Sequence, residues 1–415
     1  MSSIKEHYRI AKNFYAQIGI NTDEAIRRLR EIKISLQCWQ GDDVEGFLFK
    51  ENQLSGGIQV TGNYPGKARN AKELREDLKF ALSLIPGNHK VNLHAIYADT
   101  KEKVDLDKLE PKHFASWVKW AKENSLGLDF NPTCFSHVKA SSGFTLSSIN
   151  EEIRNFWIKH CQASRRIGEY FGKELGQKSV VNIWIPDGFK DTPVDRYGPR
   201  LRLMKSLDKI FEEKLNEDYF CDSLESKLFG IGSEAYTTGS NEFYLGYAVK
   251  NNKAICLDSG HFHPTELVSD KISSVLLYTK ELLLHISRPM RWDSDHVVIL
   301  DDELFAIASS LVRNDLVNRT HIGLDYFDGS INRVAAWVIG VRSVQKSLLR
   351  AFLEPIDYLK QVELEGDYTS RLAILNELKT YPYGAVYDYF CETEGVETKM
   401  NWLEKVKNHE KRLER

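Results

Sequence analysis

Short apolar, β-branched runs recur along the chain, and each is followed by a longer stretch whose apolar residues repeat at helical spacing. Eight of these runs predict strands, at residues 33–39, 91–97, 127–131, 180–186, 219–225, 254–258, 282–288 and 320–326. The stretches between them predict helices at 71–84, 111–123, 149–175, 199–215, 269–281, 301–314 and 331–352, with Ser148 and Asp301 as N-caps. Strands that alternate with helices in this way indicate parallel βα units.

Eight such units close most economically into a (β/α)8 barrel, the TIM-barrel fold of the α/β class. The rival is an open doubly wound sheet, whose first strand would lead into a glycine-rich phosphate turn. Here the first strand leads into residues 38–43 (CWQGDD), which lack that turn. We therefore expect a TIM barrel with an N-terminal and a C-terminal helical extension.

The 415 residues leave room for two or three ordinary domains. However, polar residues at strand ends run from Trp39 to Asp325, and in a barrel they would share one face, which forbids a domain boundary inside that span. We expect residues 1–340 to form the barrel, with an N-terminal helix and an inserted loop at 40–90. Residues 341–415 are expected to form a helical extension for subunit contacts.

The overall charge is close to zero, with 56 Lys+Arg against 59 Asp+Glu, which argues against a nucleic-acid or anionic membrane partner. The N-terminus carries charges every few residues, and no stretch reaches the ~20 apolar residues of a membrane span. The six cysteines show no paired spacing. A cytoplasmic protein with reduced thiols is the expected class.

Polar and aromatic residues gather at the C-terminal ends of the predicted strands, where the active sites of TIM barrels lie. They are Trp39, His94, Asp129, Asn131, Trp184, Asp187, Glu225, Lys227, Asp258, His261, His285 and Asp325.

The strongest local signal is the segment 258–261 (DSGH), in which a carboxylate and an imidazole flank a glycine turn and can reach one ion. Oxygen plus imidazole suits Mn²⁺, Co²⁺ or Zn²⁺ better than Ca²⁺. Taken alone, this motif is more often a solvated loop. Asp293 and Asp295 point the same way in extended chain and would repel unless a cation lay between them. An exposed acidic turn is their commoner fate, but apolar flanks at Trp292 and 297–300 favour burial.

Glu225 and Lys227 share a strand face, His285 lies in an apolar run, and Asp325 ends an apolar strand. Taken individually, Glu225 and Lys227 are interpreted as a surface ion pair and His285 as a core histidine. Asp325 is then a buried carboxylate that needs a partner. Taken together with the preceding motifs they predict two divalent-cation sites with at least one bridging carboxylate. The predicted ligands are Glu225, Asp258, His261, His285, Asp293, Asp295 and Asp325.

His94 is either an acid or base for a sugar ring oxygen or a core histidine bonded to backbone. The aromatic residues Trp39, Trp184 and Phe130 offer flat walls for the C–H faces of a sugar, or pack in the core. The glycine-rich loop 56–67 lacks the GxxxxGK[ST] spacing, so we interpret it as a cover for the site rather than a nucleotide cradle.

Five longer strings surround these positions: 38–43 (CWQGDD), 61–67 (TGNYPGK), 182–188 (NIWIPDG), 258–266 (DSGHFHPTE) and 291–296 (RWDSDH). They closely resemble the bacterial L-rhamnose isomerase family, and the resemblance runs from about residue 5 to the C-terminus, more loosely beyond about 360. It implies a barrel akin to that of xylose isomerase, two divalent metals and a homotetramer. The metal is commonly Mn²⁺, with Co²⁺, Mg²⁺ or Zn²⁺ as substitutes. The implied reaction interconverts L-rhamnose and L-rhamnulose.

The resemblance also implies a role for each matched residue. A structural metal would be held by Glu225, Asp258, His285 and Asp325, and a catalytic metal by Asp258, His261, Asp293 and Asp295. Lys227 would contact the sugar near O1 and His94 its ring oxygen, while Trp39 and Trp184 would line the pocket. An aromatic near Phe130 would reach the neighbouring subunit's site. Hydrogen transfer would follow a hydride shift or, with Asp325 as the base, an ene-diol route.

Two other classes remain open on the residues alone. A barrel epimerase or hydrolase acting on phosphorylated sugars or nucleic acid would need a basic anion clamp, for which only Lys227 and Arg291 are candidates. A non-catalytic sugar-binding protein would need aromatics and donors but no cluster of seven ligands. The small-molecule sugar remains the expected partner.

Overall fold

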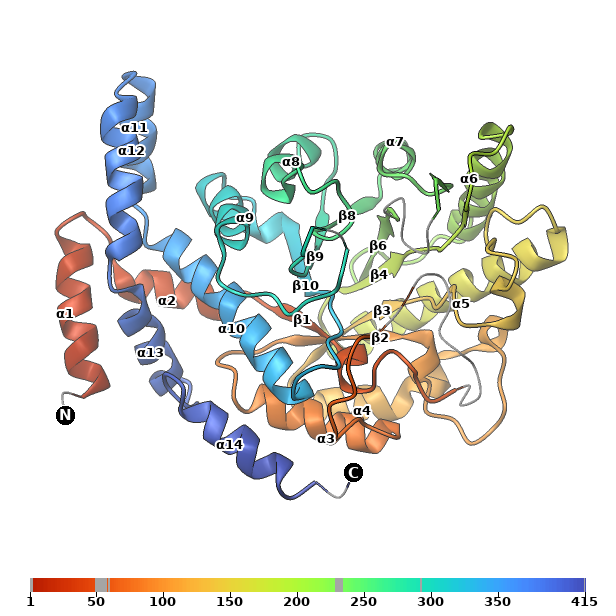
Figure 1. Cartoon of the computed structure of the whole chain (residues 1–415), viewed down its shortest axis with the longest axis horizontal. Coiled ribbons are helices and arrows are strands. Elements are labelled where there is room, and N and C mark those ends of the chain that lie inside the picture. Colours follow the sequence, from red (N-terminus) through yellow and green to blue (C-terminus); the bar gives the residue numbers. More distant parts are fainter. Residues whose placement is uncertain (1–2, 49–57, 59, 228–233, 292, 414) are drawn as a thin grey trace.

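The computed structural model describes residues 3–48, 58, 60–227, 234–291, 293–413 and 415. Its centre is a closed barrel of parallel strands in the order β1-β10-β9-β8-β6-β4-β3-β2 (Figure 1), which confirms the predicted TIM barrel. The barrel strands are β1 Ile34–Gln37, β2 Lys90–His94, β3 Gly127–Asn131, β4 Ser179–Ile183, β6 Phe220–Glu225, β8 Ala254–Asp258, β9 Leu282–Ile286 and β10 Thr320–Leu324. A small antiparallel pair, β5 Gly188–Phe189 and β7 Tyr236–Thr237, lies outside the barrel.

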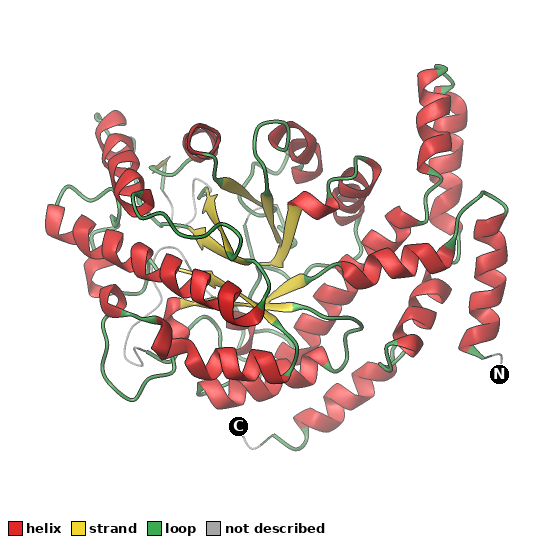
Figure 2. Ribbon diagram, turned by 180° about the vertical axis from the view of Figure 1, so that it is seen from behind, coloured by secondary structure: helices red, strands yellow, loops and turns green. Residues whose placement is uncertain are grey.

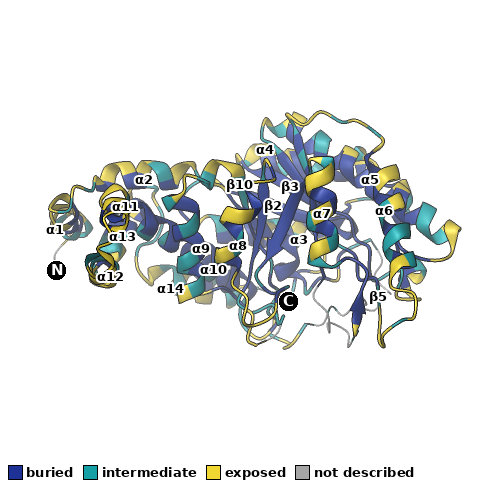
Figure 3. Cartoon of the chain, turned by 90° about the horizontal axis from the view of Figure 1, so that it is seen from above, coloured by how far each residue is buried: buried dark blue, intermediate teal, exposed yellow. Residues whose placement is uncertain are grey.

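Helices surround the barrel, and their outward faces are exposed while the strands are buried (Figure 3). The covering helices are α3 Ala71–Leu82, α4 Ala115–Glu123, α5 Glu151–Leu175, α6 Tyr197–Phe211, α7 Asn241–Asn251, α8 Val268–Val275, α9 Asp302–Arg313 and α10 Arg333–Phe352. Every predicted helix has a counterpart, but α7 was missed. Its N-terminus is capped by Ser240, and it buries Tyr244, Tyr247 and Ala248.

The helix caps decide where two of the predicted helices begin. Asp301 accepts a hydrogen bond from the backbone of Leu304 and is the N-cap of α9, as predicted. The cap of α5 is Asn150 rather than Ser148, because the Asn150 side chain accepts from the backbone N–H groups of Glu152 and Ile153. Ser148 was therefore two residues too early.

The extensions at both ends of the chain are helical: α1 Ile4–Ala16 and α2 Thr22–Glu31 at the start, and α11 Ile356–Leu364, α12 Tyr368–Glu377, α13 Tyr383–Thr393 and α14 Asn401–Glu410 at the end. Tyr8 of α1 stacks on Tyr389 of α13 with ring centroids 3.9 Å apart, so the two extensions pack on each other. The helices α11 and α12 form a hairpin that projects from the barrel in both ribbon views (Figures 1 and 2). Among the described residues, no helix is long and apolar enough to cross a membrane.

The expected domain boundary at 340/341 falls inside α10, which runs unbroken from Arg333 to Phe352. This helix follows the last barrel strand and buries Trp337, Val341 and Leu348, so it covers the barrel. The C-terminal extension therefore begins after Phe352 rather than at residue 341.

Inside the barrel, strand alternation sets which side chains meet. Asp258 is the register partner of His285, and Cys256 is the partner of Glu225. Residues two apart on a strand face the same way, so the side chains inside the barrel form levels. A polar level near the C-terminal ends of the strands lies above a lower level made by residues two positions earlier. Part of the lower level is a small apolar cluster of Val180, Cys256 and Leu283.

Candidate metal centre

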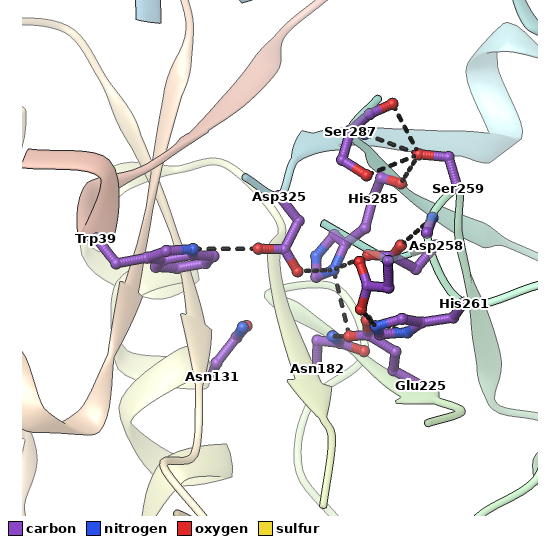
Figure 4. Close-up of polar contacts among 12 residues, drawn as sticks. Trp39, Asn131, Asn182, Glu225, Asp258, Ser259, His261, His285, Ser287 and Asp325 are labelled. Atoms are coloured by element: carbon purple, nitrogen blue, oxygen red, sulfur yellow. Dashed lines mark hydrogen bonds and ion pairs between the residues drawn. The ribbon is translucent and has the colours of Figure 1, made fainter. Parts of the chain in front are cut away.

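Four of the predicted ligands meet where β6, β8, β9 and β10 end (Figure 4). Ligand atoms of Glu225, Asp258, His285 and Asp325 all lie within 4.8 Å of one another. The Nδ1 of His285 is 3.2 Å from Glu225 Oε2 and 3.1 Å from Asp325 Oδ2. The same nitrogen is 3.8 Å from Asp258 Oδ2. The ends of four separate strands thus place three carboxylates around one imidazole, a set of oxygen and nitrogen donors that suits a divalent cation.

A second group adjoins the first. His261 follows β8, and its Nδ1 is 3.2 Å from Glu225 Oε1 while its Nε2 is 3.2 Å from Asp293 Oδ2. Gly260 makes this approach feasible, because a Cβ there would lie 2.4 Å from Asp293 Oδ1. The Gly260 amide also donates a hydrogen bond of 2.6 Å to Asp258 Oδ1, which orients the carboxylate between the two groups.

The charges around Asp295 place it with this second group. Burial raises its pKa well above the usual range, and the nearby carboxylates of Asp293, Asp325 and Asp258 add to the shift. Its backbone lies in the left-handed region at φ 47°, so the turn after Asp293 is tightly bent. Trp292, the aromatic flank used to predict burial of this segment, lies outside the described residues, as do residues 56, 57 and 59 of the glycine-rich loop.

The charges at this face are poorly balanced without a cation. Burial raises the pKa of Asp258, and the charges of Glu225, Asp325 and Asp293 raise it further. Burial alone would raise the pKa of Glu225 too, but His285 and His261 hold it well below its usual range. Two imidazoles face five carboxylates, so like charges are crowded together inside the barrel.

The donor atoms fit a divalent metal. Both ring nitrogens of His285 are buried without a hydrogen-bond partner among the described residues, although Nδ1 faces carboxylates. Buried polar atoms normally have hydrogen-bond partners. A buried imidazole nitrogen that lacks such a partner and faces carboxylates is typical of a metal ligand. Asn182 donates a hydrogen bond to Glu225 Oε2 and thereby holds that carboxylate from outside the ligand set.

Lys227 is buried two residues after Glu225, just beyond the end of β6. Its Nζ donates to the carbonyl of Pro186 at 2.9 Å and to Glu234 Oε1 at 2.6 Å. Glu234 Oε2 is buried and has no hydrogen-bond partner in the described part of the chain. Glu234 was not predicted, because it follows Lys227 by seven residues with no motif that links the two.

Trp39 and His94 form one wall of the site. The Trp39 Nε1 donates a hydrogen bond of 3.1 Å to Asp325 Oδ1, and the Trp39 and His94 rings meet edge to face at 4.7 Å. Thr133 Oγ1 lies 3.3 Å from His94 Nδ1 and Asn131 Nδ2 lies 3.5 Å from Nε2. Burial lowers the pKa of His94 to about 3, so the ring is neutral at physiological pH and can take part as a hydrogen-bonding group.

The aromatic predictions at Phe130 and Trp184 have different outcomes. Trp184 is partly buried and lies 6.0 Å from Phe135, which in turn lies 5.4 Å from His94, so Trp184 and Phe135 continue the same wall. Phe130 instead packs against Phe114 and Phe171 at 5.0 and 5.7 Å. Of the two alternatives, Phe130 therefore takes the core position, and Phe135, which sequence reasoning missed, is the phenylalanine that contacts His94.

Asp129 and Asp187, both predicted at strand ends, serve the scaffold; Asp187 follows β4, but Asp129 lies in the middle of β3. Asp187 accepts hydrogen bonds from the hydroxyl and amide groups of Thr145 and Ser147. Asp129 pairs with Lys90 Nζ at 3.0 Å. Both carboxylates are thus satisfied by protein donors and need no ion.

The barrel and its carboxylate–imidazole centre define the class: a TIM-barrel protein with a candidate metal site at the C-terminal ends of its strands. A solved structure of L-ribulose 3-epimerase shares this fold with a TM-score of 0.50 at 10% identity, covering 77% of this chain and 95% of that chain. More specifically, the L-rhamnose isomerase (RhaA) family model matches residues 2–414, and the chain belongs to that family.

Curated relatives cover essentially the whole chain. L-rhamnose isomerase of Listeria innocua is 60% identical over 410 residues, 99% of this chain and 98% of that protein. L-rhamnose isomerase of Yersinia pseudotuberculosis is 58% identical over 412 residues, 99% of each. The family resemblance drawn from the five sequence strings is confirmed.

Proposed function

We propose that the chain interconverts the aldose L-rhamnose and the ketose L-rhamnulose, with two divalent cations at the centre described above. The observation that carries the proposal is the convergence of two carboxylate–imidazole groups on one barrel face in a chain that the family model matches over residues 2–414. The reaction moves a hydrogen from C2 to C1, while the O2 hydroxyl loses a proton and O1 gains one. Atoms and charges therefore balance without an outside oxidant or reductant.

We assign the first cation to Glu225, Asp258, His285 and Asp325, and the second to Asp258, His261, Asp293 and Asp295, so that Asp258 bridges. Mn²⁺ is the proposed ion, because mixed oxygen and imidazole ligands suit it, and Co²⁺, Mg²⁺ or Zn²⁺ are the substitutes to be compared. When bound, the cations act as Lewis acids that polarise the two sugar oxygens as charge develops there.

The residues around the centre have positioning roles in this proposal. The Lys227 ammonium, held by Pro186 and Glu234, presents a hydrogen-bond donor to O1. His94 contacts the ring oxygen during ring opening and hands a proton between that oxygen and the adjacent hydroxyl. Trp39, Phe135 and Trp184 form an apolar wall for the sugar's C–H face and C6 methyl.

We favour a hydride shift over the ene-diol route. Asp325, the candidate base, has both oxygens engaged: Oδ1 accepts from Trp39 and Oδ2 faces His285 at 3.1 Å. A carboxylate held in this way is a poor acceptor for a carbon-bound proton. Conversion in D₂O with little solvent deuterium at C1 of the ketose is the expected result, and full incorporation would establish the ene-diol route instead.

The activity itself is tested by comparing kcat/KM across an aldose panel, including L-rhamnose, L-lyxose, L-mannose and D-allose, with Mn²⁺ present. L-rhamnose should have the highest value. The same preparation, stripped of metal and verified as metal-free, should lose its activity and recover it on addition of Mn²⁺. Unchanged activity after verified metal removal would contradict the proposed centre.

We also propose a cytoplasmic homotetramer. All six cysteines are free thiols, which fits a reducing compartment. The hairpin of α11 and α12 exposes Tyr358, Leu364, Tyr368 and Leu372, with 53 to 90% of each residue accessible. Apolar side chains on a projecting element favour contact with another subunit. Light scattering on the purified protein tests the tetramer.

A further inference from the structure

Cys256 lies directly beneath the proposed metal centre. It occupies β8 two residues before Asp258, so the two side chains face the same way into the barrel. Its register partner on β6 is Glu225, one of the proposed ligands. The residue is only 1% exposed and packs with Val180 and Leu283 on the level below the carboxylates.

The thiol is close enough to share ligands with that centre. The Sγ of Cys256, a carboxylate oxygen of Glu225 and a ring nitrogen of His285 all lie within 4.8 Å of one another. The imidazole is 1% exposed, and its Nε2 has no hydrogen-bond partner in the described part of the protein. The lower level thus places a sulfur within reach of one ring nitrogen of His285 and one carboxylate oxygen of Glu225.

A comparison within the same barrel shows that this arrangement is unusual. Cys221 also lies near a carboxylate and an imidazole, those of Glu281 and His321. There, however, Glu281 is already paired with Lys178 Nζ at 2.7 Å and with His321 Nε2 at 2.6 Å. A cation at Cys221 would have to displace an ammonium group, whereas among the described residues no lysine or arginine pairs with Glu225 or His285.

We propose that Glu225, Cys256 and His285 form a second ligand set for thiophilic divalent cations such as Zn²⁺ and Cd²⁺. Oxygen ligands suit Mn²⁺ and Mg²⁺, and thiolate selects softer ions. The centre therefore has two ways to hold an ion through Glu225 and His285, one completed by Asp258 and Asp325 and one by Cys256. Binding in the second way releases the thiol proton to solvent as the sulfur–metal bond forms.

The test uses the full-length protein stripped of metal and supplied with one equivalent of Zn²⁺ or Co²⁺. X-ray absorption at the zinc edge should show a sulfur neighbour at ~2.3 Å, the usual zinc–thiolate distance. The Co²⁺ form should show a sulfur-to-cobalt charge-transfer band in the near ultraviolet. Both signals should be lost in Cys256→Ser and kept in the matched control Cys221→Ser.

Each other outcome overturns the inference. A zinc spectrum of the wild-type protein with only nitrogen and oxygen neighbours removes the thiol from the centre, and this measurement does not depend on how a variant folds. Sulfur signals that persist in Cys256→Ser, or vanish in Cys221→Ser, assign the ligand to another cysteine. The inference rests on the proposed metal centre, but the cobalt spectrum distinguishes a failure of the inference from a failure of the centre. Cobalt d–d bands without a charge-transfer band would retain the centre, whereas failure of Co²⁺ to bind at all would remove both.

Discussion

The indole of Trp39 donates a hydrogen bond of 3.1 Å to Oδ1 of Asp325, which joins the end of β1 to the end of β10 where the barrel closes. The other oxygen of Asp325 lies 3.1 Å from His285 Nδ1 (Figure 4). The segment after the first strand therefore orients a proposed ligand that follows the last strand. A residue first interpreted as a sugar-facing wall is also a support for the metal centre.

This support predicts the effect of Trp39→Phe. The variant keeps a ring but removes the donor, so Asp325 loses one of its two restraints. Loss of such outer partners typically weakens metal affinity ~10- to 100-fold, and we expect a weakening in that range for Mn²⁺, measured by electron paramagnetic resonance of free Mn²⁺. Trp117→Phe is the control, because its Nε1 bonds to the Tyr97 carbonyl and contacts no ligand. Equal Mn²⁺ affinity in both variants would show that the Trp39 bond has no such role.

Asp293→Asn and Asp295→Asn should reduce turnover by orders of magnitude, because each replaces an anionic ligand of the second cation by a neutral amide. Fold stability should respond differently. Without metal, removing one of several crowded carboxylates relieves repulsion, so the melting temperature should stay level or rise. With Mn²⁺, the variants should gain less stability than the wild type, which gains ~2.7 kcal/mol at a metal concentration 100 times its dissociation constant. Thermal melts with and without Mn²⁺ measure both effects, with exposed Asp270→Asn as the control.

Substitutions of Lys227 and of Glu234 should have different effects on the kinetic constants. Lys227→Met removes the proposed contact with O1, so kcat/KM should fall by orders of magnitude while both metals still bind. Glu234→Gln keeps the shape and a hydrogen-bonding oxygen but removes the charge that pairs with Lys227 at 2.6 Å. A positioning residue of this kind should give a smaller loss, about tenfold, mainly in kcat. Steady-state kinetics with metal content verified decides, and a Glu234→Gln enzyme with wild-type kcat would leave the ion pair without a role in positioning.

Much of this fold could be predicted because parallel strands buried on both faces form apolar runs that stand out in sequence. β8 and β9, with every residue buried, are examples. The proposed ligands Asp258 and His285 followed from their place at the ends of these runs. By contrast, α7 is short and mixes aromatic and polar residues. The apolar residues between Glu225 and Ala254 therefore show no clear helical spacing, and the helix was missed.

The errors at the site have a common physical cause, which is side-chain direction. Asp129 and Asn131 of β3 face the barrel interior, so Phe130 between them must face the helices, where it meets Phe171 of α5. Strand alternation was therefore sufficient to exclude Phe130. Phe135 and Glu234 lie in loops that return to the site, and no local period indicates where such loops lead.

Substitutions in the hairpin of α11 and α12 should change the assembly of subunits without changing the fold of one subunit. Leu364→Glu and Leu372→Glu place charges on side chains that are 90 and 68% exposed in the monomer, so the fold should tolerate them. If these side chains meet another subunit, light scattering should show dissociation of the proposed tetramer to smaller species. Leu277→Glu, at an equally exposed site beyond the end of α8, is the control and should remain tetrameric. A tetramer unaffected by the hairpin substitutions would place the subunit contacts elsewhere.

At the opposite end of the barrel, Glu281 accepts from His321 and Lys178, and these partners lower its pKa to about 2. Because the folded pKa lies below the ordinary value of 4.5, the stabilisation is complete above pH 4.5 and is lost as the pH falls towards 2. Because solvent screens this partly exposed pair, Glu281→Gln should lower the free energy of unfolding at pH 7 by only about 1–2 kcal/mol, and the difference from wild type should shrink by pH 3.5. Urea unfolding of the metal-free protein at both pH values measures this. Glu213→Gln, which breaks the more exposed pair with Arg166, is the control and should change stability by less than about 1 kcal/mol. A Glu281→Gln deficit that is the same at both pH values would mean that packing, rather than the charge, accounts for the loss.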